Sequence, residues 1–159
     1  SDNDQRDYLA KKEKSDNYLH WIVQSNNTDI AYFMAFDYSP ASDRISWGYW
    51  IGEQKFLGLG LGALIPACFY NFIFETSRIT SIRAEVLSHN HNILRMHKKI
   101  GYKELETIKT STHNKDSVLE HILVLEKKDW INKSGSLRTA QANFDLPSRC
   151  NSLYSLIKI

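Results

Sequence analysis

The sequence predicts an α+β fold, a mixed and largely antiparallel sheet flanked by helices, and three observations lead to this prediction. Short stretches rich in aromatic and β-branched residues recur between turn residues, as strands do. Other stretches have the length or the apolar spacing of helices. The resulting order is helix, three strands, helix, strand, helix and two strands, so the helices are expected to pack on the sheet. The 159 residues, 42% of them hydrophobic, suffice for one domain with its own core.

The first part of the chain predicts a helix followed by an antiparallel meander. The helix covers the amphipathic residues 4–14. Strands at 17–24 and 30–38 are joined by the turn "SNNTD", because Asn and Asp hydrogen-bond their own backbone and tolerate positive φ. After a break at Pro40, a third strand is expected at 44–52.

The second part of the chain predicts two helices and three strands. Residues 63–77 are apolar on most sides and predict a buried helix, whereas 79–87 alternate like a strand with one buried face. A short helix at 91–101 ends at Gly101, a residue typical of helix C-termini. The last two strands are expected at 102–110 and 117–127.

Composition limits the domain organisation and the partners. The periodicity fades after Trp130, so residues 1–130 are predicted as the folded domain and 131–159 as a linker or tail. A net charge of +2, from 20 basic and 18 acidic residues, gives little sign of a protein that binds nucleic acid. No stretch approaches the ~18 apolar residues of a membrane span. Two cysteines are too few for a disulfide scaffold and favour reduced thiols in a cytoplasmic protein.

A turn with three alternating glycines, "EQKFLGLGLGALI" at 53–65, is the first functional signal. Between a strand and a helix, such a turn presents backbone N–H groups to an anion. A Walker loop is excluded because Ala63 follows Gly62 where Lys is needed. Gly58, Gly60 and Ala63 formally match a dinucleotide fingerprint, but that motif opens a series of βαβ units that this chain lacks room for. On this motif alone, a turn for close helix packing is an equal alternative.

A second motif, "NHNILRMHKKIGY" at 90–102, follows the turn after one helix and one strand. Together the two motifs resemble the acetyl-CoA-binding half of the GNAT superfamily of N-acetyltransferases, over about residues 5–129. The family's loop, Arg/Gln-x-x-Gly-x-Gly/Ala, places Gly60 and Gly62 on its two small positions. The stretch "FDYSPASDRISWGYWIG" resembles the subgroup acting on amino-sugar nucleotides and ribosomal-protein N-termini, closest to the N-acetyltransferase of pseudaminic acid biosynthesis.

The resemblance implies an enzyme that transfers acetyl from acetyl-CoA to a primary amine, that of an amino-sugar nucleotide first of all. The alternatives are an N-acetyltransferase of a ribosomal-protein N-terminus and a non-catalytic acyl-CoA-binding module. A homodimer is left open. The resemblance also implies that the third strand separates from the next one and that its backbone hydrogen-bonds the pantetheine arm of CoA. It further implies the residues that would bind acetyl-CoA, which are Tyr49, Trp50, Ile51, Leu57, Gly58, Leu59, Gly60, Leu61, Gly62, Ala63, Asn90 and Lys99.

Four side chains are candidates for the chemistry. His97 occupies the family's Tyr position, where an imidazole would protonate the leaving thiolate; packing under the loop is the alternative. Ser46 stands where many relatives carry a carboxylate, and would orient a water that relays the amine proton unless it only packs in the strand. Asp37 and Glu85 are alternative proton acceptors beside the substrate, although each also fits a turn cap or an exposed strand position.

The sequence departs from the family pattern at the phosphate loop and at its N-terminus. Leu57 and Leu59 replace residues that are usually polar or basic, so backbone N–H groups would hold the pyrophosphate, with Lys55 the nearest cation. Pro66 cannot donate to the Gly62 carbonyl, which predicts a loose or kinked first helical turn. Fewer residues precede "NYLHWIVQ" than the family's first strand and helix need, so an N-terminally abbreviated fold is expected.

The histidines also raise the question of a metal site. His89, His91 and His97 fall across a loop and a helix without a second cluster of ligands, so no metal is expected. Cys68 lies on the buried helix, where a core position is a better interpretation than a nucleophile.

Overall fold

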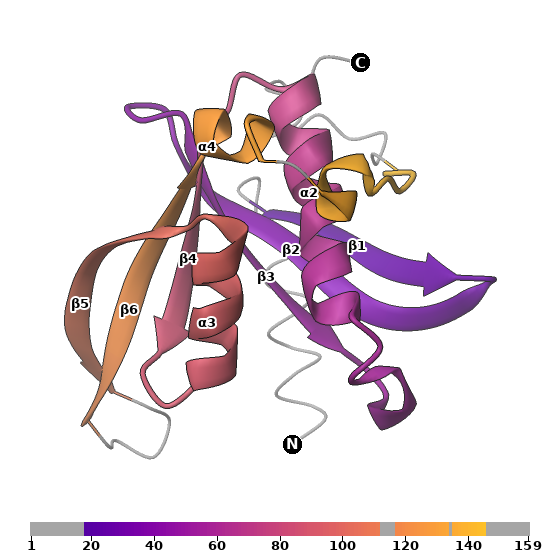
Figure 1. Ribbon diagram of the computed structural model, residues 1–159, viewed down its shortest axis with the longest axis horizontal. Coiled ribbons are helices and arrows are strands. Elements are labelled where there is room, and N and C mark those ends of the chain that lie inside the picture. The colour runs from indigo at the N-terminus through magenta and orange to yellow at the C-terminus, as the bar shows by residue number, and fades with distance from the viewer. Residues whose placement is uncertain (1–17, 112–116, 134, 146–159) are drawn as a thin grey trace.

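The computed structural model describes residues 18–111, 117–133 and 135–145; the helix predicted at 4–14 lies outside them. One six-stranded sheet has the order β1-β2-β3-β4-β6-β5, and its only parallel pair in these residues is β3 with β4 (Figure 1). The predicted mixed, largely antiparallel sheet is therefore confirmed. The strands are β1 Tyr18–Ser25, β2 Thr28–Ser39, β3 Arg44–Ile51, β4 Ser81–Leu87, β5 Lys103–Ser111 and β6 Ser117–Glu126.

Helices cover one face of this sheet. In Figure 1, the long α2 crosses in front of the β1–β3 part, and α3 lies between α2 and β4 in this view. Both helices contact Trp47 of β3, α2 through Tyr70 and α3 through His97. The helical segments are η1 Gln54–Phe56, α2 Leu61–Thr76, α3 His91–Ile100, α4 Lys127–Ile131 and η2 Ser136–Thr139. In the described part of the chain, no helix has the length and apolar character needed to cross a membrane.

The local signals in the sequence correspond to the observed turns. Asn26 and Asn27 adopt positive φ angles of 49° and 60° between the paired residues Ser25 and Thr28, which makes the predicted tight hairpin. Gly101 ends α3 with a φ of 115°, as its position predicted.

Aromatic side chains fill the core between the sheet and the two helices. Trp47, Phe33 and Phe69 pack ring against ring. The Trp47 indole N–H donates to the Tyr102 hydroxyl at 2.9 Å, and that hydroxyl donates to Tyr70 at 2.9 Å. These polar groups are thus satisfied inside the core, at the point where β3, α2 and α3 meet.

The first turn of α2 is stabilised from the neighbouring strand. α2 begins at Leu61, two residues before the predicted start, and continues through Pro66. Pro66 has no N–H for the Gly62 carbonyl, four residues earlier. The Tyr49 hydroxyl of β3 donates to that carbonyl at 2.9 Å. The acceptor that the proline leaves free is thus satisfied, and the helix runs without interruption to Thr76.

Candidate active site

β3 and β4 are neighbours in the sheet, but they pair along only part of their lengths. Their parallel register covers three residue pairs and ends at Ser46 opposite Arg83. Beyond it, residues 47–51 of β3 continue to pair with β2, and residues 84–87 of β4 continue to pair with β6. The two strands therefore separate, and within the described residues each leaves one backbone edge without a strand partner.

A cavity of about 400 Å³ occupies this opening. Tyr49 and Trp50 both line it, although consecutive residues of a strand point to opposite faces. The opening therefore reaches from the helix-covered face of the sheet toward the other face. Its lining comes from β3, the glycine turn, β4, the following loop and α3: Trp47, Gly48, Tyr49, Trp50, Ile51, Leu57, Ala84, Glu85, Val86, Leu87, His89, Asn90, Ile93 and His97.

The glycine turn lies beside the opening and has unused hydrogen-bond donors. Gly58 and Gly60 both have a φ of 79°, a left-handed conformation that favours glycine. A Cβ on either would meet nothing within 4 Å, so the space above the turn is open. Among described residues, no acceptor receives the N–H groups of residues 58–62, whereas those of Leu57 and Ala63 bond within the turn at 3.0 and 3.1 Å. The five N–H groups of residues 58–62 are therefore available to a ligand.

The turn itself supplies no unpaired cation. Lys55 contacts Glu53 at 2.5 Å, so the cation predicted to lie nearest the pyrophosphate already has a carboxylate partner. The side chains of Leu57 and Leu59 are 57% and 67% exposed. An anion bound here would meet backbone N–H groups and the N-terminal end of α2 rather than charged side chains of the turn.

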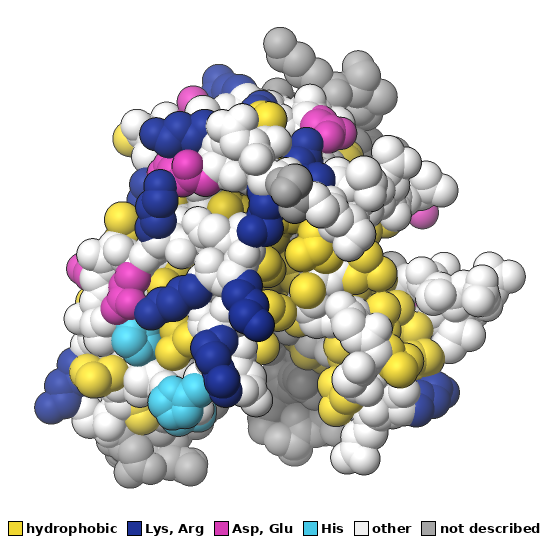
Figure 2. Space-filling view, viewed as in Figure 1, with side chains coloured by type: hydrophobic (Ala, Val, Ile, Leu, Met, Phe, Trp, Pro, Cys, Tyr) yellow, Lys and Arg dark blue, Asp and Glu magenta, His cyan; other side chains and the backbone are white. Residues whose placement is uncertain are grey.

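Positive charge lies instead on α3. Figure 2 shows Lys and Arg side chains gathered over this helix, next to apolar side chains over the start of α2. Arg95 and Lys99 line a second cavity of about 490 Å³, which Ala63 of α2 borders from the other side. Lys99 was predicted from the sequence, but Arg95 was missed. The two are four residues apart and so share one face of a helix, a spacing that could have identified Arg95.

His97 lies within the core at the edge of the opening. The side chain is 3% exposed, and its ring stacks on Tyr102 with a centroid separation of 4.7 Å and an interplanar angle of 19°. The buried Nδ1 has no hydrogen-bond partner among the described residues. Burial lowers the pKa of His97 from 6.5 to about 4, because the charged form would lose its hydration. The ring is therefore neutral at pH 7, and it can donate a hydrogen bond without being an imidazolium.

The other predicted catalytic and substrate-binding residues are only partly brought together. Glu85 lines the opening and contacts Arg83 at 2.8 Å. Ser46 is buried at the last paired position of β3 and is not part of the lining. Asp37 is exposed in an irregular part of β2 with a φ of 52°, on the far side of the paired segment from the opening. The geometry therefore groups Glu85 with His97 and leaves Asp37 apart.

The predicted cofactor-binding residues divide between the two cavities. Tyr49, Trp50, Ile51, Leu57 and Asn90 line the opening between β3 and β4. Ala63 and Lys99 line the second cavity, on the other side of α3. In sequence, the five open N–H groups of the turn lie between Leu57, which lines the first cavity, and Ala63, which lines the second. Within the described ranges, no three His, Cys, Asp or Glu side chains form a group that could hold a metal ion.

Comparison with known proteins agrees with this geometry. A family model described as an acetyltransferase (GNAT) domain matches residues 1–103. A search of curated proteins finds no match. Many solved structures share the fold, among them two spermidine N-acetyltransferases and a protein of Streptococcus mutans.

The spermidine N-acetyltransferase of Vibrio cholerae, in complex with CoA and spermine, has a TM-score of 0.71 and 10% identity, covering 83% of this chain and 79% of that chain. A chimera of spermidine N-acetyltransferase from Vibrio cholerae and hSSAT has a TM-score of 0.73 and 11% identity, with 84% and 81% covered. A protein of Streptococcus mutans has a TM-score of 0.63 and 17% identity, with 77% of each chain covered. The family match spans most of the chain, so the protein belongs to the GNAT acetyltransferases, which use acetyl-CoA, as its two motifs predicted.

Proposed function

We propose that this protein transfers the acetyl group of acetyl-CoA to a primary amine of a small molecule, in the opening between β3 and β4. The observation that carries the proposal is the separation of these strands after Ser46. It gives a cavity that reaches toward both faces of the sheet, so two substrates can approach each other from opposite sides. Holding them in one orientation supplies much of the acceleration of such a bimolecular reaction.

Successive parts of the cofactor would bind to backbone and side-chain groups of β3, the glycine turn and the start of α3. The unpaired edge of β3 at residues 49–51 offers backbone hydrogen bonds to the amide groups of the pantetheine arm. The open N–H groups of residues 58–62 would hold the pyrophosphate, assisted by the dipole of α2. Asn90 begins α3 without using its side chain as a cap, so its amide can bond a ligand in the opening.

Two residues at the opening would handle protons. Acetyl-CoA supplies a thioester whose carbonyl carbon forms the new bond to the amine nitrogen while the sulfur leaves as a thiolate. His97 would donate an N–H hydrogen bond to that sulfur from its neutral ring, because burial keeps it uncharged at pH 7. Glu85 would accept the proton that the amine loses. A water oriented by Ser46 remains the predicted alternative route for that proton.

For the acceptor, we propose an amino-sugar nucleotide, with a ribosomal-protein N-terminus as the alternative. Trp50 is 40% exposed and stacks on Tyr32 with a centroid separation of 4.2 Å. Such a flat aromatic surface at the opening favours an acceptor that contains a ring. Two of the structural neighbours are spermidine N-acetyltransferases, so spermidine is a further amine to compare. The cytoplasmic location expected from the cysteine content belongs to the same proposal.

Release of free thiol from acetyl-CoA tests the proposal. The full chain should release thiol with an amino-sugar nucleotide faster than with the free amino sugar, an N-terminal peptide or spermidine. Trp50→Ala should raise KM for ring-containing acceptors and leave KM for spermidine unchanged. Calorimetry with acetyl-CoA in the absence of amine distinguishes an enzyme from a non-catalytic binding module. Binding without turnover on any amine would favour the non-catalytic acyl-CoA-binding module, and no binding would contradict both interpretations.

A further inference from the structure

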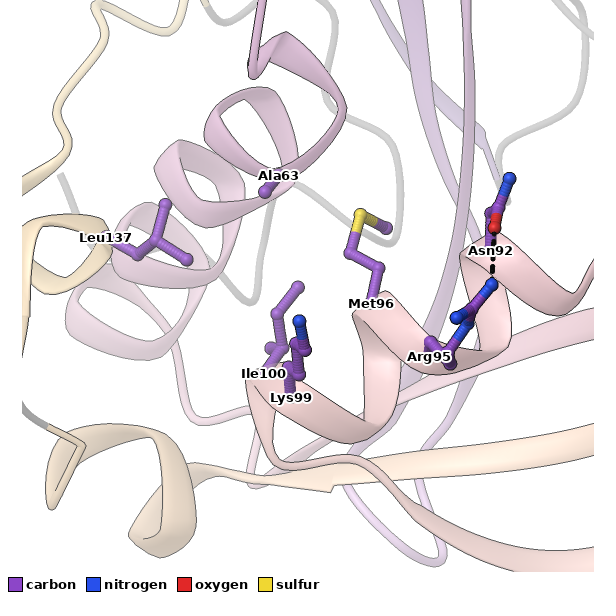
Figure 3. A pocket seen from close by; sticks show the side chains of 7 residues that line it. All are labelled: Ala63, Asn92, Arg95, Met96, Lys99, Ile100 and Leu137. Atoms are coloured by element: carbon purple, nitrogen blue, oxygen red, sulfur yellow. Dashed lines mark hydrogen bonds between the residues drawn. The ribbon is translucent and has the colours of Figure 1, made fainter. Parts of the chain in front are cut away.

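The cavity between α3 and the start of α2 has an apolar wall and a positive rim. It measures about 490 Å³ and is lined by Ala63, Asn92, Arg95, Met96, Lys99, Ile100 and Leu137. Figure 3 shows Leu137 and Ala63 on one side, facing the side chains of α3 on the other. Leu137 belongs to η2, in the segment that the sequence predicted as a linker or tail.

A buried amide on α2 fixes the position of η2. Asn71 is 5% exposed, and its side-chain N–H groups donate to the carbonyls of Leu137 and Ala140 at 3.0 and 2.7 Å. Its side-chain oxygen accepts the indole N–H of Trp130 at 2.9 Å and a guanidinium N–H of Arg138. Because every donor and acceptor of a buried amide is used, η2 is held in one place against α2.

Contacts on both sides of η2 hold the rest of the segment. Before it, the Lys133 ammonium donates to the carbonyl of Lys99 at the end of α3, at 2.7 Å. After it, Phe144 stacks on Phe72 of α2 with a centroid separation of 4.2 Å and an interplanar angle of 11°. The indole N–H of Trp21 donates to the Asp145 carbonyl at 3.1 Å. Residues 135–145 are therefore fixed to α2 and β1, and Lys133 just before them is fixed to the end of α3.

The charge of the cavity indicates the kind of ligand. Arg95 is exposed and donates to the Asn92 side chain at 2.9 Å (Figure 3). In the described part of the chain, no carboxylate forms an ion pair with Arg95 or Lys99. Two cations beside an apolar wall suit a flat apolar ring that carries a phosphate. The cavity also borders α2 at Ala63, directly after the open N–H groups of the turn.

We propose that residues 135–145 are part of the cofactor site, with Leu137 as the wall for the adenine ring of CoA. Arg95 and Lys99 bind the phosphate on its ribose. This inference rests on the proposed function, because it extends the same ligand past the glycine turn. The C-terminal segment then determines that the donor is a full CoA thioester rather than a shorter pantetheine thioester. Asn71 is a positioning residue, since it acts only through η2.

Calorimetry with three probes tests this role: acetyl-CoA, acetyl-dephospho-CoA, which lacks the ribose phosphate, and S-acetylpantetheine, which lacks the nucleotide. Leu137→Ala should weaken acetyl-CoA about tenfold and leave S-acetylpantetheine unchanged. Arg95→Gln should weaken acetyl-CoA about tenfold and acetyl-dephospho-CoA much less, because it removes a charged hydrogen bond to the missing phosphate. Arg95 is exposed, so this variant remains informative if Leu137→Ala folds poorly. Leu105→Ala, on an exposed leucine of β5, is the matched control and should bind all three probes like the parent.

The outcomes separate the two proposals. If the parent binds acetyl-CoA no more tightly than S-acetylpantetheine, or if both variants bind acetyl-CoA like the parent, the role of residues 135–145 is wrong and the proposed function stands. If the parent binds neither acetyl-CoA nor S-acetylpantetheine, the proposed function fails and this inference fails with it.

Discussion

The two edges of β3 differ in how many residues pair with a neighbouring strand. Toward β2, pairing extends from Arg44 to Ile51 with one irregularity. Toward β4, it stops at Ser46. A central strand normally satisfies its backbone on both sides, and an unpaired buried edge is costly. The open half of the β4 side is therefore where a ligand, rather than a strand, can complete the hydrogen bonding.

The same comparison separates structural from chemical side chains. Along the paired part, side chains such as Ile45 are buried and only pack. Where the strands separate, polar groups reach a cavity, as Glu85 does, or lie buried at its edge without a described partner, as His97 does. If the residues at the opening act on substrates and the packed residues only hold the fold, substitutions at the opening should change binding or turnover. Substitutions at the packed residues should change stability.

The largest effect is expected from His97→Phe, which keeps a ring but removes the N–H donor. Turnover should fall about 10²–10⁴-fold, the usual contribution of one positioned acid or base, with little change in the affinity for acetyl-CoA. His97→Tyr should restore part of the rate, because it returns a hydroxyl donor. Steady-state kinetics and calorimetry measure the two quantities. A His97→Phe protein with nearly normal turnover would remove His97 from the mechanism.

The pKa of His97 makes a second prediction, on stability. Burial lowers this pKa to about 4, against 6.5 in an unfolded chain. The folded state therefore binds fewer protons than the unfolded state between these values. The contribution of neutral His97 to the free energy of unfolding is fully present above pH 6.5. It is lost as the pH falls toward 4, which lowers this free energy by about 3 kcal/mol. His97→Phe should make the free energy of unfolding fall less over this range, measured with denaturant at each pH. His91→Phe, at an exposed position of α3, should fall as the parent does.

Gly60→Val tests the turn beside the opening. A β-branched residue at a φ of 79° is strained by about 1–2 kcal/mol, and its side chain would extend into the open space above the N–H groups. Acetyl-CoA affinity should fall about tenfold or more, with the melting temperature recorded alongside. Gly52→Val has no positive φ to strain and lies before the turn, so it should bind like the parent. Equal affinity of Gly60→Val and the parent would place the pyrophosphate elsewhere.

Which features the sequence could predict depends on how far apart in the chain the interacting residues lie. The hairpin at Asn26, the glycine turn and the end of α3 depend on neighbouring residues, and the sequence predicted each of them. The separation of β3 from β4 after Ser46 depends on how distant strands pack. The residues of 44–52 themselves do not indicate where the pairing ends, and only the family resemblance implied that the two strands separate. The low pKa of His97 likewise depends on burial among residues distant in the chain.

One of the missed features did leave a signal in the sequence. Asn71 is a polar residue within the apolar stretch "ALIPACFYNFIFETS", and a buried amide requires hydrogen-bond partners from elsewhere in the chain. It finds them in η2, which the fading periodicity after Trp130 had hidden. For Asp37, a position near a strand end in the sequence does not bring the residue to the opening between β3 and β4, and its role beside the substrate stays a prediction.

A smaller effect on turnover is expected at Ser46, where the pairing of β3 with β4 ends. Ser46 is buried where the pairing ends, so an influence on the amine proton has to pass through a water. Ser46→Ala should lower turnover about tenfold, less than the loss of a direct acid or base, while KM for acetyl-CoA stays constant. Ser81→Ala, also buried but at the closed end of β4, is the control and should leave turnover unchanged. Equal turnover of Ser46→Ala and the parent would assign Ser46 to strand packing and leave Glu85 as the proton acceptor.

The smallest effect concerns the support of the turn from β3. Tyr49→Phe removes the donor to the Gly62 carbonyl and should cost about 1 kcal/mol of unfolding free energy. Pro66→Ala restores the helical N–H that can serve the same carbonyl, so Tyr49→Phe should cost less in that background. Leu64→Ala changes the same helical turn without supplying a donor, and there the two costs should add. Denaturant unfolding of the single and double variants gives the coupling. Additive costs with Pro66→Ala would mean that the Tyr49 hydroxyl does not replace the missing proline donor.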